Sequence, residues 1–248
     1  MRQTRRTTAL ITIGMVSAVL TGCGSEEKKP DAAPASSSAA TTTSAAPTTS
    51  KPDPSKIVKQ AFDGAKAAKA VHVVIDFQGD GKKSHIDMAG AMDGNNMKAV
   101  VKDDSTGNYE VIAAGGSTWM KLLDKTSVDK AGASAGATGK FLPVKGDKMK
   151  NMAGGAPKDL LDKFIGAVNM DWIKNGKASV EPITVGGVKA WKISDPAGGG
   201  AAYAVVSDDS KNELLEVGKV PAIKVAFSQW DAVATIAPPT GDQLFKQK

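Results

Sequence analysis

Arginine is almost absent from this sequence of 248 residues, and its three copies, Arg2, Arg5 and Arg6, all lie in the first six positions. The formal net charge of +6 therefore overstates how basic the rest of the chain is, because 29 lysines there are balanced by 26 acidic residues. A chain without arginine lacks the planar guanidinium group that binds phosphates and guanine edges in a bidentate manner. Nucleic acid is therefore not expected as a partner.

Cysteine and histidine are also scarce, which removes the usual ingredients of catalytic and metal sites. One cysteine cannot build a disulfide framework, and the two histidines, His72 and His85, lie outside any HExxH spacing. Neither zinc hydrolysis nor a nucleophile elbow of the G-x-S-x-G type is expected. We expect no enzyme activity, no cofactor and no metal ion.

The N-terminal residues 1–22 are typical of a secretory signal, with three arginines followed by an apolar stretch at 9–20. This stretch is shorter than the ~20 residues that a membrane-spanning helix needs. The sequence Leu-Thr-Gly-Cys at 20–23 resembles the lipobox of bacterial lipoproteins, in which cleavage occurs before the cysteine and the thiol carries diacylglycerol. We expect Cys23 to be lipidated and to hold the protein at the extracytoplasmic face of the cell membrane. The alternative is an ordinary secreted protein with a chance cysteine.

Residues 23–54 form a tether that is rich in Ala, Ser, Thr and Pro and has almost no side chains able to build a core. Such a composition cannot offset the entropy of ordering the chain, so the tether is expected to be disordered. Its root-mean-square reach is on the order of 30 Å. It serves either as a leash between membrane and wall or as a passive spacer.

From residue 55 onward the pattern indicates one α+β domain, 55–248, with two small domains as the alternative. A helix is predicted from Ser55, its N-cap, because the apolar residues of 57–65 fall on one face. After Val71 the period changes to two, which is typical of β-strands.

Turn signals of the Asp-Gly type at 80–81 and 93–94 predict two hairpins with a defined register. A two-residue turn at the first places Ile75 opposite Ile86, and the second continues the same apolar face into a third strand. A slip by one residue would destroy this face. The sequence therefore predicts a five-stranded antiparallel meander over 71–122.

The middle of the chain, 123–175, is dominated by Gly, Ala and Lys and is weakly helical. The predicted elements there are a short helix at 127–137, an edge strand at 141–144 and a helix at 157–168. Further strands are predicted at 177–184, 188–194, 201–207, 213–218 and 222–230, with a tail near 232–237.

Two groups of polar residues have both a functional and a plain interpretation. His85 faces Asp76 in the predicted register, which suits either an acid–base or metal pair or, more simply, a polar pair on the wetter face. The acidic pairs at 103–104 and 208–209 are suited to weak calcium binding or to turn formation. The plain interpretation is favoured in each case.

This arrangement resembles the LppX/LprG/LprF family of actinobacterial lipoproteins, whose fold is similar to that of the LolA/LolB lipoprotein carriers. The resemblance rests on the lipobox, the tether, the segments 71–73 and 111–121, and the closing strand at 225–230. It implies a strongly curved antiparallel half-barrel with helices packed over its concave face and an apolar cavity that accepts acyl chains of lipids or glycolipids. The segment 123–156 departs from the family pattern, where a lid over the cavity would be expected.

The first hypothesis is accordingly a monomeric, lipid-anchored protein that binds and carries lipid or glycolipid acyl chains. The predicted register groups the candidate cavity lining on one side of the first meander: Val73, Ile75, Phe77, Ile86, Met88, Met97, Ala99, Val101, Tyr109 and Val111. The second hypothesis is a non-enzymatic envelope lipoprotein with a filled core that binds a protein or cell-wall partner.

Overall fold

The computed structural model describes residues 51–144, 155–167, 171–197 and 202–246. Contacts within the chain divide it into two units, and every described residue belongs to the second, which runs from Thr49 to Lys248. The signal segment, Cys23 and nearly all of the tether lie outside the described residues.

The described residues form eleven strands and a small number of helices. The strands are β1 (Ala70–Gly79), β2 (Lys82–Ala91), β3 (Met97–Asp103), β4 (Gly107–Ala114), β5 (Ser117–Leu122), β6 (Phe141–Val144), β7 (Ser179–Val185), β8 (Val188–Ser194), β9 (Ala202–Ser207), β10 (Leu214–Lys219) and β11 (Ile223–Ser228). The helices are α1 (Pro54–Ala67), α2 (Lys125–Ala131), α4 (Pro157–Ala167) and α5 (Asp171–Lys174), with 3-10 turns at Ala135–Ala137 and Gly241–Gln243.

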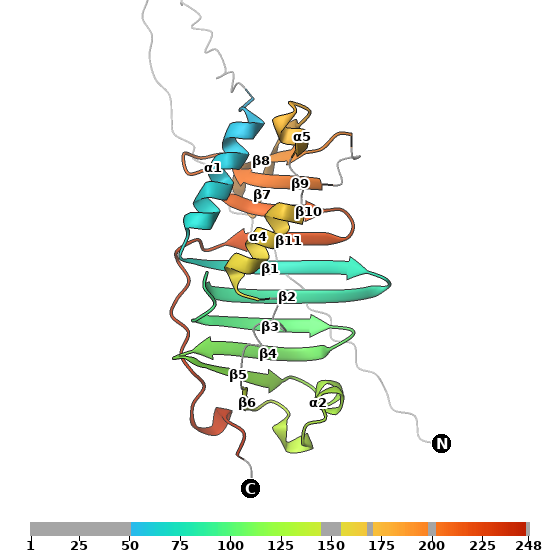
Figure 1. Cartoon of the computed structure of the whole chain (residues 1–248), viewed down its shortest axis with the longest axis vertical. Helices are drawn as coiled ribbons and strands as arrows, with labels where there is room; N and C mark the ends of the chain where they lie inside the picture. The colour runs from blue at the N-terminus through green and yellow to red at the C-terminus, as the bar shows by residue number, and fades with distance from the viewer. Residues whose placement is uncertain (1–50, 145–154, 168–170, 198–201, 247–248) are drawn as a thin grey trace, which may run out of the picture. The chain divides into compact units, whose positions relative to one another are not determined.

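All eleven strands join one antiparallel sheet in the order β6-β5-β4-β3-β2-β1-β11-β10-β9-β8-β7 (Figure 1). The sheet is open, with β6 and β7 at its edges, and α1 and α4 lie over one of its faces (Figure 1). We call this the covered face, and the other the opposite face. The α+β class with an antiparallel sheet is confirmed.

The register of the first meander is confirmed as well. Ile75 pairs with Ile86, and Ile86 in turn pairs with Val101. Asp80 and Gly81 both have positive φ angles, of 50° and 72°, which is the backbone of a type I′ turn. Turn chemistry and apolar alternation therefore specify the same pairing.

The two meanders meet through β1 and β11, a pairing that no turn in the sequence specifies. Val73 lies opposite Phe227, and Ile75 lies opposite Val225. Because both strands alternate in the same phase, their apolar residues continue one face across the junction. The strands predicted between 177 and 230 thus form the other half of the same sheet.

Helix α1 begins two residues earlier than predicted, with Asp53 as its N-cap instead of Ser55. The Asp53 carboxylate accepts from the backbone N–H groups of Ser55 at 2.9 Å and Lys56 at 3.3 Å. Pro54 has no N–H to satisfy and a φ angle suited to the first helical position, which explains the shift. The Ser55 hydroxyl instead donates to the carbonyl of Ile173 at 3.1 Å and links α1 to α5.

The predicted strand-like tail near 232–237 is wrong, because these residues pair with no strand. They are held instead by side-chain bonds: the Ile236 N–H donates to Asn96 at 2.9 Å, and the Asn96 amide donates to the Ile236 carbonyl at 2.8 Å. Further on, the Phe245 N–H donates to the Phe141 carbonyl at 2.9 Å. The tail therefore crosses the ends of the first meander (Figure 1).

The main core lies between the covered face and the helices. It contains the buried residues Ile57, Val58, Ala61 and Ala65 of α1 and Leu160 and Leu161 of α4, together with inward residues of every strand except β6. Two small clusters lie elsewhere, one around Ile112 and Phe141 and the other around Ala190 and Tyr203.

Candidate functional site

The ten residues predicted to line a cavity share the covered face, as their cross-strand partners show. Most are buried, and Met88 and Ala99 have no exposed surface at all. Ile86 is half-buried, and Phe77, near the end of β1, has 46% of its surface exposed. The face exists as predicted, and most of it is in close contact with neighbouring side chains.

Free space on the covered face occurs beside α4. A pocket of about 160 Å³, which we call the α4 pocket, lies between this helix and strands β10 and β11. Its walls are almost wholly apolar, and its lining residues are Lys163, Phe164, Val217, Gly218, Lys219, Ile223 and Val225. Val225 pairs with Ile75 and Ile223 pairs with Phe77, so the α4 pocket adjoins the predicted lining.

A second apolar pocket, of about 390 Å³, lies along α1 and α5. Val58, Phe62 and Ile173 provide its apolar wall, and charged residues of α1, among them Lys59 and Lys66, lie at its rim. It lies on the helix side of the core, away from the predicted strand residues.

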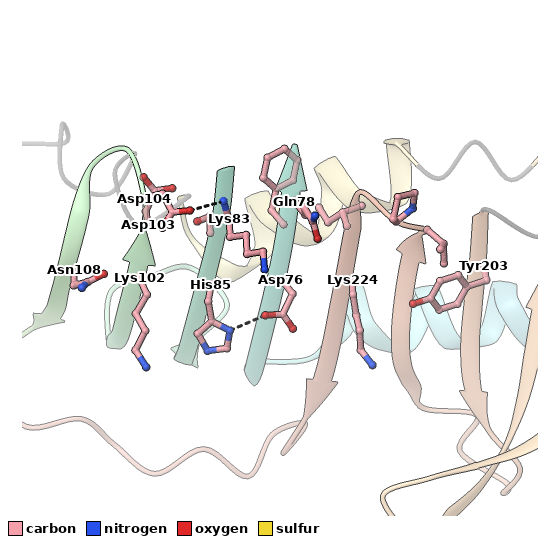
Figure 2. Close-up of a pocket in the computed structure, with 15 residues that line it drawn as sticks. Asp76, Gln78, Lys83, His85, Lys102, Asp103, Asp104, Asn108, Tyr203 and Lys224 are labelled. Atoms are coloured by element: carbon pink, nitrogen blue, oxygen red, sulfur yellow. Dashed lines mark hydrogen bonds and ion pairs between the residues drawn. The ribbon is translucent and has the colours of Figure 1, made fainter. Parts of the chain in front are cut away.

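The opposite face carries a larger groove of about 480 Å³, which we call the polar groove (Figure 2). It extends around the end of the sheet to Phe77 and to Ile223, which also lines the α4 pocket. Three lysines and three aspartates line it, so the charges of the two signs are interspersed: Lys83, Lys102, Lys224, Asp76, Asp103 and Asp104. Such a groove has no strong field of one sign. Its apolar lining comes from Phe77, Val220, Pro221 and Ile223 at the end of the sheet. Of the ten predicted lining residues, only Phe77 contributes to it.

The histidines form polar cross-strand contacts on this opposite face. His85 Nδ1 lies 2.7 Å from an Asp76 carboxylate oxygen, as the register predicts (Figure 2). His72 contacts Asp87 at 2.9 Å through Nε2 and Ser228 at 3.0 Å through Nδ1. Within the described ranges no three His, Cys, Asp or Glu side chains come together in a way that would hold a metal ion.

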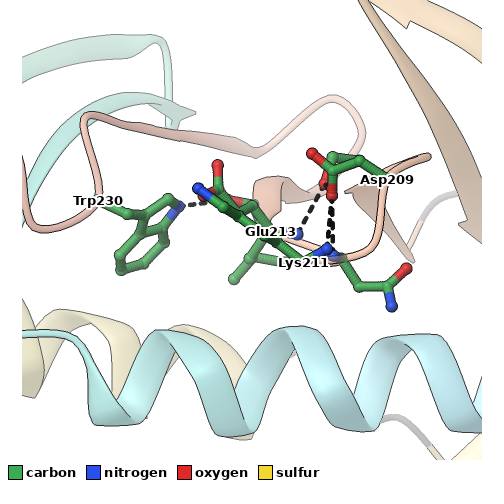
Figure 3. A network of polar contacts seen from close by, with 7 residues as sticks. Asp209, Lys211, Glu213 and Trp230 are labelled. Atoms are coloured by element: carbon green, nitrogen blue, oxygen red, sulfur yellow. Dashed lines mark hydrogen bonds and ion pairs between the residues drawn. The ribbon is translucent and has the colours of Figure 1, made fainter.

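In each acidic pair suggested as a weak calcium site, one aspartate accepts hydrogen bonds from the backbone of its own turn. The Asp103 carboxylate accepts from the N–H groups of Ser105 at 2.8 Å and Thr106 at 2.6 Å. Asp209 accepts in the same way from Lys211 at 2.9 Å and Asn212 at 3.0 Å (Figure 3). Partial burial raises the pKa of Asp103, but hydrogen bonds from Thr106 and Ser105 lower it further. The pKa of Asp103 therefore lies below its ordinary value.

The turn that holds Asp209 is fastened to its surroundings by two neighbouring groups (Figure 3). The Ser207 hydroxyl donates to the Asp209 carboxylate at 2.9 Å and accepts from the Glu213 N–H at 2.7 Å. The Trp230 indole N–H donates to the Leu214 carbonyl at 2.9 Å. These contacts hold one side of a small pocket of about 170 Å³, whose other side is formed by residues of α1.

A G-x-S-x-G spacing does occur at 132–136, although no nucleophile elbow was expected. Gly132 is the left-handed C-cap of α2, and Ser134 precedes a single 3-10 turn, so the serine does not follow a strand. A nucleophile elbow requires a sharp strand-to-helix turn, and both histidines lie in β1 and β2 with aspartate partners. The residues at 132–136 therefore end helix α2 and do not form a nucleophile elbow.

Two buried glutamates were not anticipated from the sequence. Glu110 is 7% exposed and contacts Lys98 at 3.1 Å and also Lys121. Burial raises the pKa of Glu110, but the two ammonium groups outweigh it, so the pKa lies below its ordinary value. No sequence pattern distinguishes this acid from the exposed ones, because the signal is its position between lysines on neighbouring strands.

Glu216 is similarly placed on β10, where it contacts Lys224 at 2.8 Å. The Tyr203 hydroxyl donates to the other oxygen of Glu216 at 2.6 Å. Burial raises the pKa of Tyr203 well above its ordinary value, and the nearby Glu216 charge adds to this. Gly218 makes room for the tyrosine, since a Cβ there would lie 2.6 Å from the Tyr203 hydroxyl oxygen.

Among the described residues, no helix has both the length and the apolar character needed to cross a membrane. Cys23 and the apolar stretch at 9–20 lie outside those residues, so lipidation stays a prediction.

No protein-family model and no curated protein matches the chain. Among solved structures it is similar to LprF from Mycobacterium bovis, with 18% identity and a TM-score of 0.45 over 77% of this chain and 100% of LprF. It is also similar to Mycobacterium tuberculosis lipoprotein LppX, with 14% identity and a TM-score of 0.41 over 75% of this chain and 100% of LppX. Both proteins belong to the group that the sequence was found to resemble. This likeness says nothing of a ligand.

Proposed function

We propose that the protein is an envelope lipoprotein, anchored through Cys23, that binds lipid acyl chains between its sheet and the helices over the covered face. The observation that carries the proposal is the α4 pocket, an apolar space beside a continuous apolar sheet face. Flexible hydrocarbon needs apolar walls and few hydrogen-bonding groups, and Phe164, Val217 and Ile223 provide such walls.

The size of the α4 pocket limits what it holds in the unliganded state. Ligand pockets usually measure ~300–1,000 Å³, whereas this space is about 160 Å³. It therefore accepts part of one acyl chain. A longer chain would reach the predicted lining around Met88 and Ala99 only if α4 moved away from the strands, because those residues have no exposed surface.

The proposal includes a sheet that curves around the helices as a half-barrel. One core cluster contains Leu122 of β5 and Val180 of β7, which lie near opposite edges of the sheet. Eleven strands spaced ~4.8 Å apart would spread over about 50 Å if they were flat. Two helices, each ~10–12 Å wide, would then cover little of such a sheet. Curvature explains how one core includes both ends.

The close packing of Met88 and Ala99 favours the second candidate function, in which the protein has a filled core and binds a protein or cell-wall partner. The two candidates differ in whether the α4 pocket takes up hydrocarbon.

A fluorescent fatty-acid analogue distinguishes them when it is added to the full chain carrying Cys23→Ser. Ile223→Trp would fill the α4 pocket and should weaken binding at least about tenfold, as expected for blocking an apolar site of this kind. The matched control is Val188→Trp, which adds the same ring at a 44% exposed position on β8 and should leave binding unchanged. Equal binding by all three proteins, or no binding by the parent, would overturn the proposal.

A further inference from the structure

The rim of the α4 pocket carries two lysines that the acyl-chain hypothesis alone does not use. Lys163 lies on α4 and Lys219 lies at the end of β10, and both are exposed. No carboxylate is among the described residues that line the α4 pocket. Across the part of the chain that the structure describes, neither ammonium group forms an ion pair.

The strand pairing of Lys219 explains why it lies at the rim of the α4 pocket. Lys219 pairs with Ile223, which in turn pairs with Phe77, so the three residues form one row across β10, β11 and β1. Val217 lies two positions before Lys219 and is buried in the core, so alternation places Lys219 on the same covered face. The charged residue of this row, Lys219, therefore lies beside the apolar α4 pocket.

Exposed apolar side chains border the same end of the sheet. Phe77 is 46% exposed, and Val220, which directly follows Lys219 in the turn to β11, is 60% exposed. Both line the polar groove and not the α4 pocket, although they lie at the same end of the sheet. The α4 pocket itself combines apolar walls with two lysines at its rim. A molecule that matches it has hydrocarbon on one side and negative charge on the other.

We propose that the α4 pocket selects lipids with an anionic headgroup, which Lys163 and Lys219 bind while the acyl chain enters between Phe164 and Val217. This inference rests on the proposed function, since it assumes that the α4 pocket accepts hydrocarbon. Each ammonium group offers three donors to phosphate or carboxylate oxygens. The polar groove has lysines too, but its aspartates offset them.

Two lipids with the same single acyl chain test the inference, lysophosphatidylglycerol with an anionic head and lysophosphatidylcholine with a zwitterionic one. Binding to the full chain carrying Cys23→Ser is followed by calorimetry at low salt. We expect the anionic lipid to bind about tenfold more tightly, and the difference to shrink at high salt because exposed charges are screened.

The double variant Lys163→Gln, Lys219→Gln should remove this preference and leave lysophosphatidylcholine binding within about twofold, because exposed lysines contribute to the charge term and not to hydrocarbon burial. Arginine at both positions should retain the preference. Lys102→Gln, in the polar groove, is the matched control and should have no effect. Melting temperatures show whether every variant is folded.

The outcomes separate the two levels of the proposal. If neither lipid binds the parent protein, the proposed function fails and the inference with it. If both bind equally, or if Lys102→Gln removes the preference, the inference alone is overturned. Competition by glycerol phosphate as strong as by the anionic lipid would show a site for free anions, which also contradicts it.

Discussion

Glu110 lies on the opposite face of β4, with Lys98 of β3 and Lys121 of β5 on either side. A carboxylate that is only 7% exposed is stable as an anion only where cations replace the lost water. Lys121 also lies over the Phe141 ring, with its nitrogen 4.5 Å from the ring centre. Glu110 thus links β3, β4 and β5 through its ion pairs, and Lys121 extends this contact to the Phe141 ring.

Replacing this acid by its neutral amide should make stability less dependent on pH. Glu110→Gln should cost about 1–2 kcal/mol at pH 7, because the two partly exposed lysines lose their anion. The folded pKa of Glu110 is lowered from 4.5, so its contribution is present above pH 4.5 and is lost as pH falls through the folded value. Urea unfolding at pH 7 and at pH 3 should show the difference between the variants shrinking in acid.

The control is Glu213→Gln, since Glu213 is more exposed and lies 3.6 Å from Lys211. It should change stability by less than ~0.5 kcal/mol at both pH values. A cost for Glu110→Gln that stays constant between pH 7 and pH 3 would contradict the charge-based account.

The two tyrosines of the chain should resist ionisation in the folded state. Burial raises the pKa of Tyr109, and burial together with Glu216 raises that of Tyr203. Both raised values favour the neutral phenol, so this stability is complete below pH 10 and is lost as pH rises through the folded pKa values. Phenolate absorbance at pH 10 should be far below half of its maximum until urea is added. Half-ionisation of the folded protein at pH 10 would refute this.

At the scale of elements, the hairpins were predictable and the joining of distant strands was not. The Asp-Gly signal at 80–81 and the alternation around it define the register of β1 and β2, because only one register keeps Ile75 and Ile86 on a common apolar face. The β1–β11 pairing has no turn to specify it and depends on long-range burial. The sequence does not single out Lys163 and Lys219 as residues at a pocket rim, because lysine is common throughout the chain.

The corrected start of α1 gives a test of capping. Asp53→Ala should destabilise the protein by about 1 kcal/mol, since the N–H groups of Ser55 and Lys56 lose their acceptor. Asp63→Ala, which removes only an exposed pair with Lys59, should cost less than ~0.5 kcal/mol. Thermal melts compare the two, and an equal cost would argue against Asp53 as the cap.

Enlarging side chains on the covered face shows where space exists. Ala99→Phe should cost about 1–3 kcal/mol, because this position has no exposed surface and must be overpacked. Ile223→Trp should cost less, since it is partly exposed and borders the α4 pocket. Denaturant unfolding of both variants decides the matter. A tolerated phenylalanine at position 99 would place open space at the predicted lining instead.

For the whole molecule, the proposed anchor and the proposed ligand site lie in separate parts of the chain. The core lies within 49–248, whereas the proposed lipidation site is Cys23, the first residue of the predicted tether. Two acyl chains on one residue are enough for stable attachment to a membrane. The tether would then let the folded unit move while it stays attached.

The anchor is tested by metabolic labelling with a fatty acid. Cys23→Ser should abolish labelling and leave an uncleaved precursor, while Ser25→Ala, two residues further on, should be labelled like the wild type. Labelling of the Cys23→Ser variant at the wild-type level would show that Cys23 is not the anchor.

Native mass spectrometry of the full chain carrying Cys23→Ser, purified from a lipid-rich preparation, tests the acyl-chain claim most directly. The account predicts a species heavier than the bare chain by one extractable lipid, and its loss in Ile223→Trp, where the α4 pocket is filled. Bare protein alone, in the parent as in the variant, would contradict it.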